Sequence, residues 1–204
     1  MKNGKFIVIE GIDGCGGETQ TNLLKKYFGE DNILFLSFPC YETKLGQIVD
    51  EFLHKRIIFD EKDVELLVYY ADILQSKPAI SKALSEGKYV ITDRYFTSTI
   101  AFQSLAGKSI RDILNLDDIF KLPVPDACFL LDISAEESQR RKSKEKEGFV
   151  NLDRNESNLI FMDSIRNQYL KVAQEQIFCK WEIIDGEKSI NEVFEEIKSK
   201  IELI

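Results

Sequence analysis

The chain has 204 residues, 44% of them hydrophobic and 30% charged, which is the composition of a globular protein with one sizeable core. A formal net charge of −8 argues against a nonspecific binder of nucleic acid or of membrane surfaces. No apolar run approaches the roughly 18 residues of a membrane span, and no charged-then-apolar leader opens the sequence. We therefore expect a single cytoplasmic domain, residues 1–204, that binds neither nucleic acid nor membrane.

The first predicted strand, residues 6–9, runs directly into a glycine-rich turn and then a helix that ends at Gly29. Backbone N–H groups of such a turn, together with the positive end of the helix dipole, form a site for phosphate. Gly11 and Gly16 have the spacing of the two glycines in the P-loop pattern G-x-x-x-x-G-K-[ST]. The sequence therefore predicts a phosphate-binding loop here.

The two positions after Gly16 depart from that pattern, because Gly17 stands in place of the lysine and Glu18 in place of the hydroxyl. Two unit charges about 5 Å apart at an effective dielectric of about 20 repel by roughly 3 kcal/mol, so Glu18 could oppose the phosphates. A carboxylate is also a good magnesium ligand, which would reverse the sign of its effect. We expect backbone amides to bind phosphate in either case, and turnover to be slow unless cations elsewhere compensate.

Further along the chain, apolar runs of strand length alternate with segments of helical periodicity. The predicted strands are residues 33–38, 89–92, 126–131 and 181–184. The predicted helices are residues 45–53, 61–85 (kinked or divided at Pro78), 134–147 (opened by a capping box of Ser134 and Glu137), 155–178 and 189–201. This alternation predicts an α/β fold with a five-stranded parallel sheet covered by helices on both faces.

Ligands of such sheets bind outside the carboxyl ends of the strands. The glycine loop, Phe38-Pro39, Asp93-Arg94 and Asp132 all fall at that edge. An arginine there can bind a phosphate through two hydrogen bonds, and an aspartate can hold magnesium. We therefore expect a site for phosphate-bearing ligands at this edge of the sheet.

With these pieces placed, the chain resembles the thymidylate kinases, which are P-loop nucleoside monophosphate kinases. The similar segments, in order, are Phe6-Ile7-Val8-Ile9-Glu10-Gly11-Ile12-Asp13-Gly14, Phe38-Pro39-Cys40-Tyr41, Asp93-Arg94-Tyr95 followed by Ser98, Ala101, Phe102 and Gln103, Arg166-Asn167-Gln168-Tyr169, and Ile184-Asp185-Gly186 followed by Glu192 and Val193. The resemblance implies a P-loop NTPase-type three-layer α/β/α fold, transfer of a phosphoryl group from ATP to dTMP with Mg²⁺, and a homodimer.

The resemblance also implies a role for each matching residue. Those implied for catalysis are Asp13, Arg94, Arg140 and Arg141, the two arginines belonging to a lid segment around residues 140–154. Those implied for ATP are Gly11, Gly14, Gly16, Gly17, Glu18, Thr19 and Asp185. Those implied for the acceptor are Asp13, Phe38, Tyr41, Tyr69, Arg94, Ser98, Phe102, Gln103 and Tyr169, and those implied for the metal are Asp93 and Glu18.

Several alternatives stay open on the sequence alone. Ile73 stands where the family has an arginine near the base, so the acceptor could be a different nucleotide, and the altered loop is also compatible with a catalytically impaired nucleotide-binding paralogue. Tyr69 could be a core residue, and Arg94 could form a surface ion pair with Asp93 or Asp72. The scattered cysteines indicate reduced thiols, and His54 a surface position.

Overall fold

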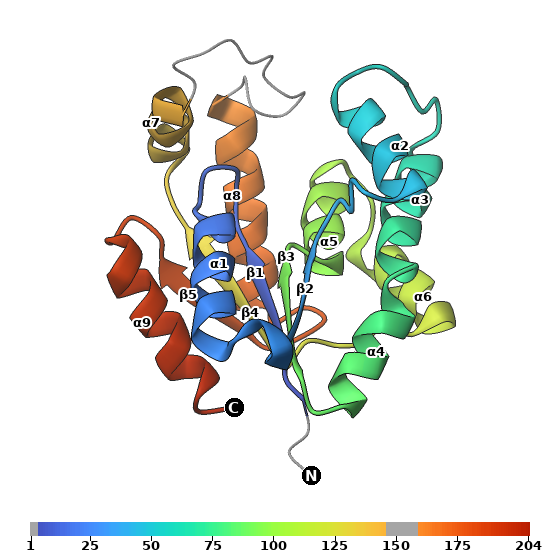
Figure 1. Ribbon diagram of the computed structural model, residues 1–204. Helices are drawn as coiled ribbons and strands as arrows, with labels where there is room; N and C mark the ends of the chain where they lie inside the picture. The colour runs from blue at the N-terminus through green and yellow to red at the C-terminus, as the bar shows by residue number, and fades with distance from the viewer. Residues whose placement is uncertain (1–3, 146–158) are drawn as a thin grey trace.

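The computed structural model describes residues 4–145 and 159–204. Its centre is a five-stranded sheet in the order β2-β3-β1-β4-β5, in which every neighbouring pair is parallel (Figure 1). The strands are β1 (Phe6–Glu10), β2 (Ile33–Ser37), β3 (Tyr89–Asp93), β4 (Ala127–Asp132) and β5 (Trp181–Asp185). The predicted parallel sheet is confirmed.

Helices follow the strands along most of the described chain. They are α1 (Gly17–Phe28), α2 (Lys44–Leu53), α3 (Lys62–Leu74), α4 (Lys77–Ser85), α5 (Phe96–Leu105), α6 (Ile110–Phe120), α7 (Ala135–Glu145), α8 (Leu159–Gln174) and α9 (Ile190–Ile201), with a short 3₁₀ turn η1 (Glu30–Asn32). Pro78 lies in the first turn of α4, so the predicted helix 61–85 is divided rather than kinked.

The sheet separates two apolar cores, because successive side chains of a strand point to opposite faces. Ile7 and Ile9 of β1 pack with Leu24 of α1 and with the inner side of α9. Phe6 and Val8 face the other way, toward a larger core that takes in residues of α3, α4, α5, α6 and α8. The predicted three-layer arrangement, with helices on both faces, is therefore confirmed.

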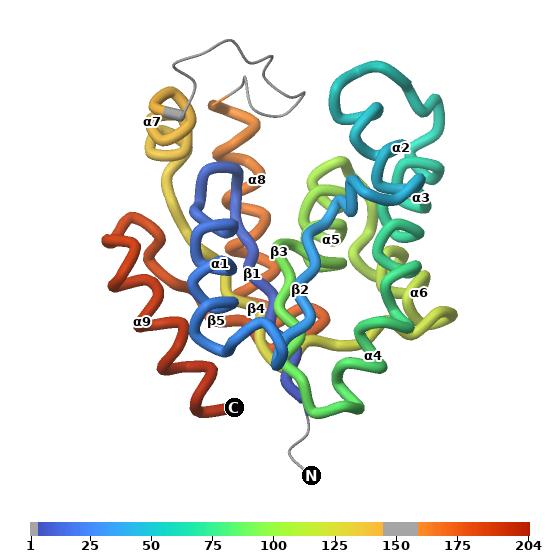
Figure 2. Tube along the Cα trace, in the orientation of Figure 1, coloured from blue at the N-terminus to red at the C-terminus, as the bar shows by residue number. Residues whose placement is uncertain are grey.

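The strand register brings the carboxyl ends to one edge. Ile9 of β1 and Ser37 of β2 both pair with Asp93, and Asp132 of β4 pairs with Asp185 of β5. Figure 2 shows the β1–α1 loop at this edge, between α7 on one side and α2 and α3 on the other. The polar residues that end the strands are thus gathered around one loop.

Three local expectations need correction. Helices α5 and α6, which fill the stretch between β3 and β4, are absent from the predicted elements. The Ser134 hydroxyl accepts a hydrogen bond from the Glu137 amide at 3.2 Å and so caps α7. The reciprocal bond of a capping box is absent, because the Ser134 amide donates to Glu187 and the Glu137 carboxylate binds arginines of α7 instead. The predicted capping box is therefore wrong. The helix predicted for 155–178 ends at Gln174, and residues 155–158 lie outside the described residues.

Candidate active site

The glycine turn between β1 and α1 forms a cradle at the positive end of a helix. Gly14 and Gly16 have φ angles of 76° and 97°, a left-handed conformation that side chains disfavour, and α1 begins at Gly17. One pocket surrounds this turn, and all the residues predicted for ATP except Asp185 line it. They are Gly11, Gly14, Gly16, Gly17, Glu18 and Thr19. We call this hollow the donor pocket.

Asp185 does not line the donor pocket, although its neighbours do. Its carboxylate accepts a hydrogen bond from the Glu187 amide at 3.0 Å and so closes the turn after β5. Gly186, Glu187, Lys188, Ser189 and Ile190, which follow it, form one wall of the pocket. The family resemblance pointed to this turn through Asp185-Gly186, but it gave no role to the four residues that follow Gly186.

Position 17 is crowded by an acidic side chain. A Cβ atom on Gly17 would lie 2.7 Å from Oδ1 of Asp93, so the carboxylate occupies space that a side chain at position 17 would need. Within residues 4–145 and 159–204 the Asp93 carboxylate has no hydrogen bond and no ion pair of its own. Burial raises its pKa, with Glu18 and Asp13 acting in the same direction and Arg94 opposing them.

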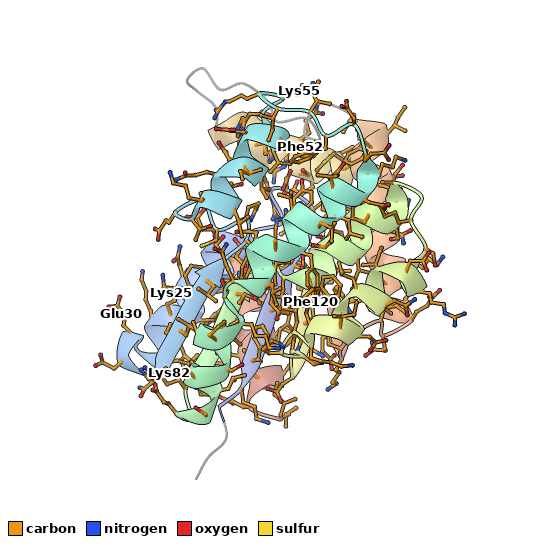
Figure 3. All side chains as sticks on the ribbon, turned by 90° about the vertical axis from the view of Figure 1, so that its right-hand side faces the viewer. Lys25, Glu30, Phe52, Lys55, Lys82 and Phe120 are labelled. Carbon is orange, nitrogen blue, oxygen red and sulfur yellow. The ribbon has the colours of Figure 1, made fainter. Side chains whose placement is uncertain are left out.

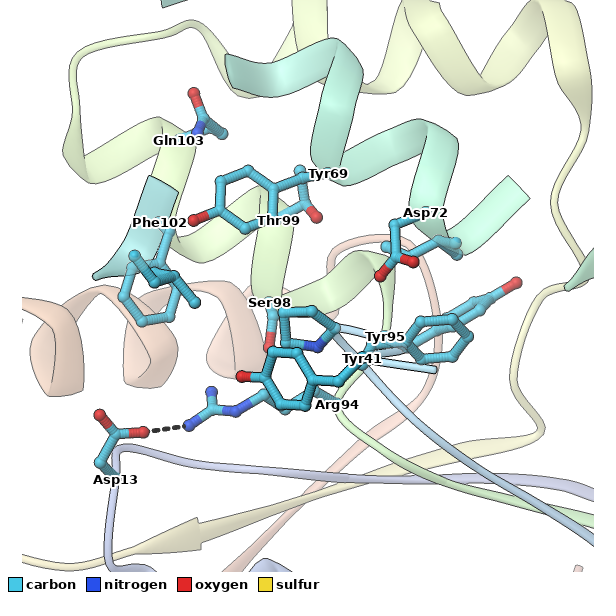
Figure 4. A pocket seen from close by; sticks show the side chains of 14 residues that line it. Asp13, Tyr41, Tyr69, Asp72, Arg94, Tyr95, Ser98, Thr99, Phe102 and Gln103 are labelled. Atoms are coloured by element: carbon cyan, nitrogen blue, oxygen red, sulfur yellow. Dashed lines mark hydrogen bonds and ion pairs between the residues drawn. The ribbon is translucent and has the colours of Figure 1, made fainter. Parts of the chain in front are cut away.

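A second pocket, the acceptor pocket, lies between the sheet edge and helices α3 and α5 (Figure 4). Eight of the nine residues predicted for the acceptor line it: Asp13, Phe38, Tyr41, Tyr69, Arg94, Ser98, Phe102 and Gln103. Tyr69 stands edge-on to Phe52 at 6.3 Å between ring centroids, and it faces the pocket, so the alternative of a purely core position is wrong. Tyr169, the ninth residue, is fully buried beneath the pocket and does not line it.

Arg94 and Asp13 line both pockets, and among the residues that the structure describes no others do so. Nη2 of Arg94 lies 2.6 Å from Oδ1 of Asp13, and Nη1 donates to the Tyr169 hydroxyl at 3.1 Å. The alternative of a surface ion pair with Asp93 or Asp72 is therefore wrong. Arg94 has a φ of 65°, which is unusual for a residue with a side chain and is characteristic of strained functional sites.

Glu10 is a buried acid that sequence reasoning did not assign to the site. It is 1% exposed, and its carboxylate accepts hydrogen bonds from the Tyr95 amide (3.1 Å), Thr97 (2.6 Å), Ser98 (2.7 Å) and Tyr169 (2.9 Å). Burial raises the pKa of Glu10, while Arg94 and the hydrogen bonds from the three hydroxyls lower it. The signal that could have found it is an acid inside an otherwise apolar strand.

Helix α7 holds arginines against the donor pocket. Arg141 donates to the carbonyls of Gly14 and Cys15, both at 3.3 Å, and to that of Gly186 at 2.7 Å. Glu137 binds both Arg141 and Arg140, and these hydrogen bonds lower its pKa to about 2. Both arginines line the donor pocket, and their catalytic role stays a prediction. Residues 146–154 of the predicted lid lie outside the described residues.

The position that lacks the family arginine is apolar. Ile73 is buried and lines the acceptor pocket. Its neighbour Asp72 is 2% exposed, and burial raises the pKa of its carboxyl. The carboxylate accepts hydrogen bonds from the backbone amide of Cys40 at 2.9 Å and from the side-chain amide of Gln75 at 2.8 Å. Asp72 therefore holds the segment after β2 against α3.

The remaining predictions concern residues outside the two pockets. His54 ends α2 at the surface, where it contacts Asp50, and the four cysteines are free thiols. Across the described part of the chain, no helix is long and apolar enough to cross a membrane, and no group of three or more histidine, cysteine or acidic side chains gathers as a metal site would require.

Comparison with known proteins identifies the family. The family model for thymidylate kinase matches residues 9–197. A thymidylate kinase of Prochlorococcus marinus is 36% identical and covers 97% of this chain and 98% of its own, and a probable thymidylate kinase of Pyrococcus abyssi is 33% identical over 95% and 94%. The solved thymidylate kinase of Candida albicans, 22% identical, has the same fold with a TM-score of 0.78 over 98% of this chain and 92% of its own. Since the match runs through both pockets and nearly the full length of these relatives, the chain belongs to the thymidylate kinase family.

Proposed function

We propose that this protein transfers the γ-phosphoryl group of ATP to dTMP, giving ADP and dTDP. The observation that carries the proposal is that the two pockets meet at Asp13 and Arg94. A phosphoryl group passed from one pocket to the other must cross that junction. Such transfer depends on positioning and charge neutralisation more than on covalent help from the protein, and both are available there.

The donor pocket suits a nucleoside triphosphate. The amides from Gly14 to Thr19 surround the start of α1, where the helix dipole favours a polyphosphate. Arg140 and Arg141 supply positive charge on the opposite wall. We assign the nucleotide base to the side of the turn after β5, where Gly186 and Ser189 line the pocket.

The acceptor pocket suits a nucleoside monophosphate whose phosphate binds Arg94. A guanidinium group can make two charged hydrogen bonds to a phosphate, and that of Arg94 is held in place by Tyr169. Asp13, on the other side of Arg94, is placed to accept a hydrogen bond from the sugar. Tyr69 and Phe102 offer aromatic surface for the base, and Gln103 offers a polar group at the far end.

Asp93 and Glu18 are the proposed magnesium ligands. Magnesium in phosphoryl-transfer sites is held by one or two carboxylates together with phosphate oxygens and water, so two carboxylates beside the loop fit it. The raised pKa of Asp93 reflects burial among other acids, which a divalent cation would relieve. When bound, the metal neutralises phosphate charge.

We also propose that the protein is a cytoplasmic homodimer. Support for a dimer comes from apolar side chains that remain exposed on α3 and at the end of α6, including Leu67 (50% exposed) and Ile119 (73%). Figure 3 shows α3 and the end of α6 at Phe120 on the same side of the molecule. Sedimentation at micromolar concentration tests the proposal: a dimer is expected, and a monomer would contradict it.

The test of function is a coupled assay of the purified protein with ATP and Mg²⁺ over a panel of nucleoside monophosphates. We expect dTMP to be the best acceptor. A higher kcat/KM for another monophosphate would reject the acceptor, with Ile73 as the first residue to examine. Binding of ATP and dTMP without turnover on any acceptor would reject the transfer reaction itself.

A further inference from the structure

One wall of the acceptor pocket belongs to the connection between β2 and α2. Phe38, Pro39 and Tyr41 of this connection line the pocket. The Phe38 amide donates to the Asp93 carbonyl at 2.9 Å, and beyond that bond the backbone leaves the sheet. Backbone outside a sheet or a helix needs hydrogen bonds from elsewhere to keep one position. The groups that supply those bonds therefore decide where this wall of the pocket stands.

A buried carboxylate on α3 holds the middle of the connection. Asp72 lines the same pocket and projects into it from α3 (Figure 4). One of its oxygens accepts from the Cys40 amide at 2.9 Å, and the other accepts from the side chain of Gln75 at 2.8 Å. Hydrogen bonds to a charged group are stronger than those between neutral groups, and a carboxylate that is 2% exposed depends on them. Asp72 therefore fixes the connection to α3.

Thr43 completes the attachment, because three parts of the chain meet at its hydroxyl. The hydroxyl donates to the Cys40 carbonyl at 2.9 Å, lies 3.4 Å from Oδ1 of Asp72, and accepts from the side chain of Gln75 at 2.9 Å. It also accepts from the Gly46 amide at 3.0 Å and so caps α2. The connection, α2 and α3 are thus joined at one point. We call Thr43, Asp72 and Gln75 the clasp.

Helix α2 carries the effect of the clasp to a second side of the pocket. A Cβ atom at Gly46 would overlap the Cys40 carbonyl, so α2 begins closer to the connection than a residue with a side chain allows. Farther along α2, Leu53 lines the acceptor pocket and Phe52 stands edge-on to Tyr69. A shift at the start of α2 would therefore move two sides of the pocket together.

Building on the proposed function, we propose that Thr43 and Asp72 are positioning residues that hold the acceptor pocket open at the width of a nucleoside monophosphate. Thr43 does not line the pocket and acts through the connection and α2. A pocket that is formed in only a fraction of the molecules binds its ligand more weakly by that fraction. The clasp residues do not line the donor pocket, so binding of ATP should not depend on them.

The sharpest test compares Thr43→Val with Thr43→Ser. Valine keeps the shape of threonine without the hydroxyl, serine keeps the hydroxyl, and the position is partly exposed, so both variants should fold. Asp72→Asn, which turns one acceptor oxygen into a donor, is the second test. The control is Ile197→Val, which removes one methylene from the buried core on the other face of the sheet and lines neither pocket.

The measurements are kcat, the KM for dTMP and for ATP, the calorimetric Kd for dTMP, and the melting temperature. We expect Thr43→Val to raise the KM and the Kd for dTMP about tenfold, as the loss of one or two net hydrogen bonds implies, with kcat and the KM for ATP within about twofold. Thr43→Ser should stay near the wild type, and Asp72→Asn should raise the two dTMP constants at least as far as Thr43→Val. Ile197→Val should lower the melting temperature alone.

Two results would overturn the proposal. A Thr43→Val protein with a lowered melting temperature but dTMP constants within about twofold of the wild type would make the clasp a purely structural feature. Equal changes in Thr43→Ser and Thr43→Val would show that the hydroxyl is not responsible. If Asp72→Asn does not fold, the two Thr43 variants still decide the matter.

Failure of the proposed function gives a different result. If the wild type binds dTMP but transfers no phosphoryl group to it, the transfer reaction is rejected, and the calorimetric affinities of the Thr43 variants still accept or reject the clasp. If the wild type turns over dTMP and Thr43→Val binds dTMP equally well, the function stands and the clasp is rejected. A wild type that does not bind dTMP overturns both proposals.

Discussion

Replacing Glu10 with alanine tests whether the buried acid supports the acceptor site. Its carboxylate accepts from one amide and three hydroxyls, and removing it leaves those donors in a region that water does not reach. Ser98 and Tyr169 keep a partner, because their hydroxyls also bond to each other at 2.8 Å. The Tyr95 amide loses its partner, and the Thr97 hydroxyl is left with the Cys128 thiol, which is a weak acceptor.

The expected magnitude follows from that count. A buried donor left unsatisfied costs about 1–3 kcal/mol, so these two donors together cost at most about 6 kcal/mol. Removing a carboxylate whose burial raises its pKa recovers part of that amount, because the charge no longer has to be desolvated. We therefore expect Glu10→Ala to lower the free energy of unfolding by about 3 kcal/mol, and Glu10→Gln, which keeps one acceptor oxygen, by about half as much.

Urea denaturation followed by circular dichroism measures both variants, with Glu30→Ala on the exposed turn after α1 as the control. The control should lie within about 0.5 kcal/mol of the wild type. Because Glu10 holds Tyr169, which in turn holds Arg94, the KM for dTMP should rise in the same order as the stability falls. A Glu10→Ala protein within about 1 kcal/mol of the wild type would refute the assigned network.

Three further predictions follow from the site. Arg94→Ala should weaken dTMP binding at least about 30-fold in titration calorimetry, because two charged hydrogen bonds to the phosphate are lost, and an unchanged affinity would remove Arg94 from the acceptor site. Glu18→Ser should raise the Mg²⁺ concentration needed for half-maximal turnover, since a charged oxygen ligand is lost, and a lower requirement would show that Glu18 only repels phosphate. The carboxyl of Glu137 should titrate near pH 2 by NMR, below its ordinary 4.5, and its pKa should return toward 4.5 in Arg140→Ala. Because this pKa is lowered in the folded state, the pairing of Glu137 with the arginines stabilises the fold above pH 4.5, and that contribution is lost as the pH falls toward 2.

Much of the architecture could be read from the sequence, because it depends on local pattern. The apolar runs 6–9 and 89–92 are buried strands, and the polar residues that follow them lie at one edge of the sheet. Helix α5 escaped prediction because Phe96, Thr99 and Ile100 are all buried, so the helix has no polar face to mark its period. Helix α6 does have an amphipathic pattern and could have been found from it.

The parts of the site that could not be predicted depend on contacts between distant residues. Glu10 lies 159 positions from Tyr169, and no spacing rule connects a strand residue to a helix so far along the chain. Arg140 and Arg141 were recognised as cations of the site, but the sequence could not say which of the two binds the glycine loop. That distinction comes from the way Ser138 and Arg141 dock α7 on the loop.

The central claim is that a loop without its lysine still supports transfer of phosphate from ATP to dTMP. The most direct measurement incubates the purified protein with ATP, dTMP and Mg²⁺ and quantifies all four nucleotides by chromatography over many turnovers. The account predicts one dTDP and one ADP formed for each dTMP and ATP consumed, with product far exceeding the amount of protein and falling sharply in Arg94→Ala. Loss of ATP without dTDP, or no product beyond one per protein molecule, would contradict it.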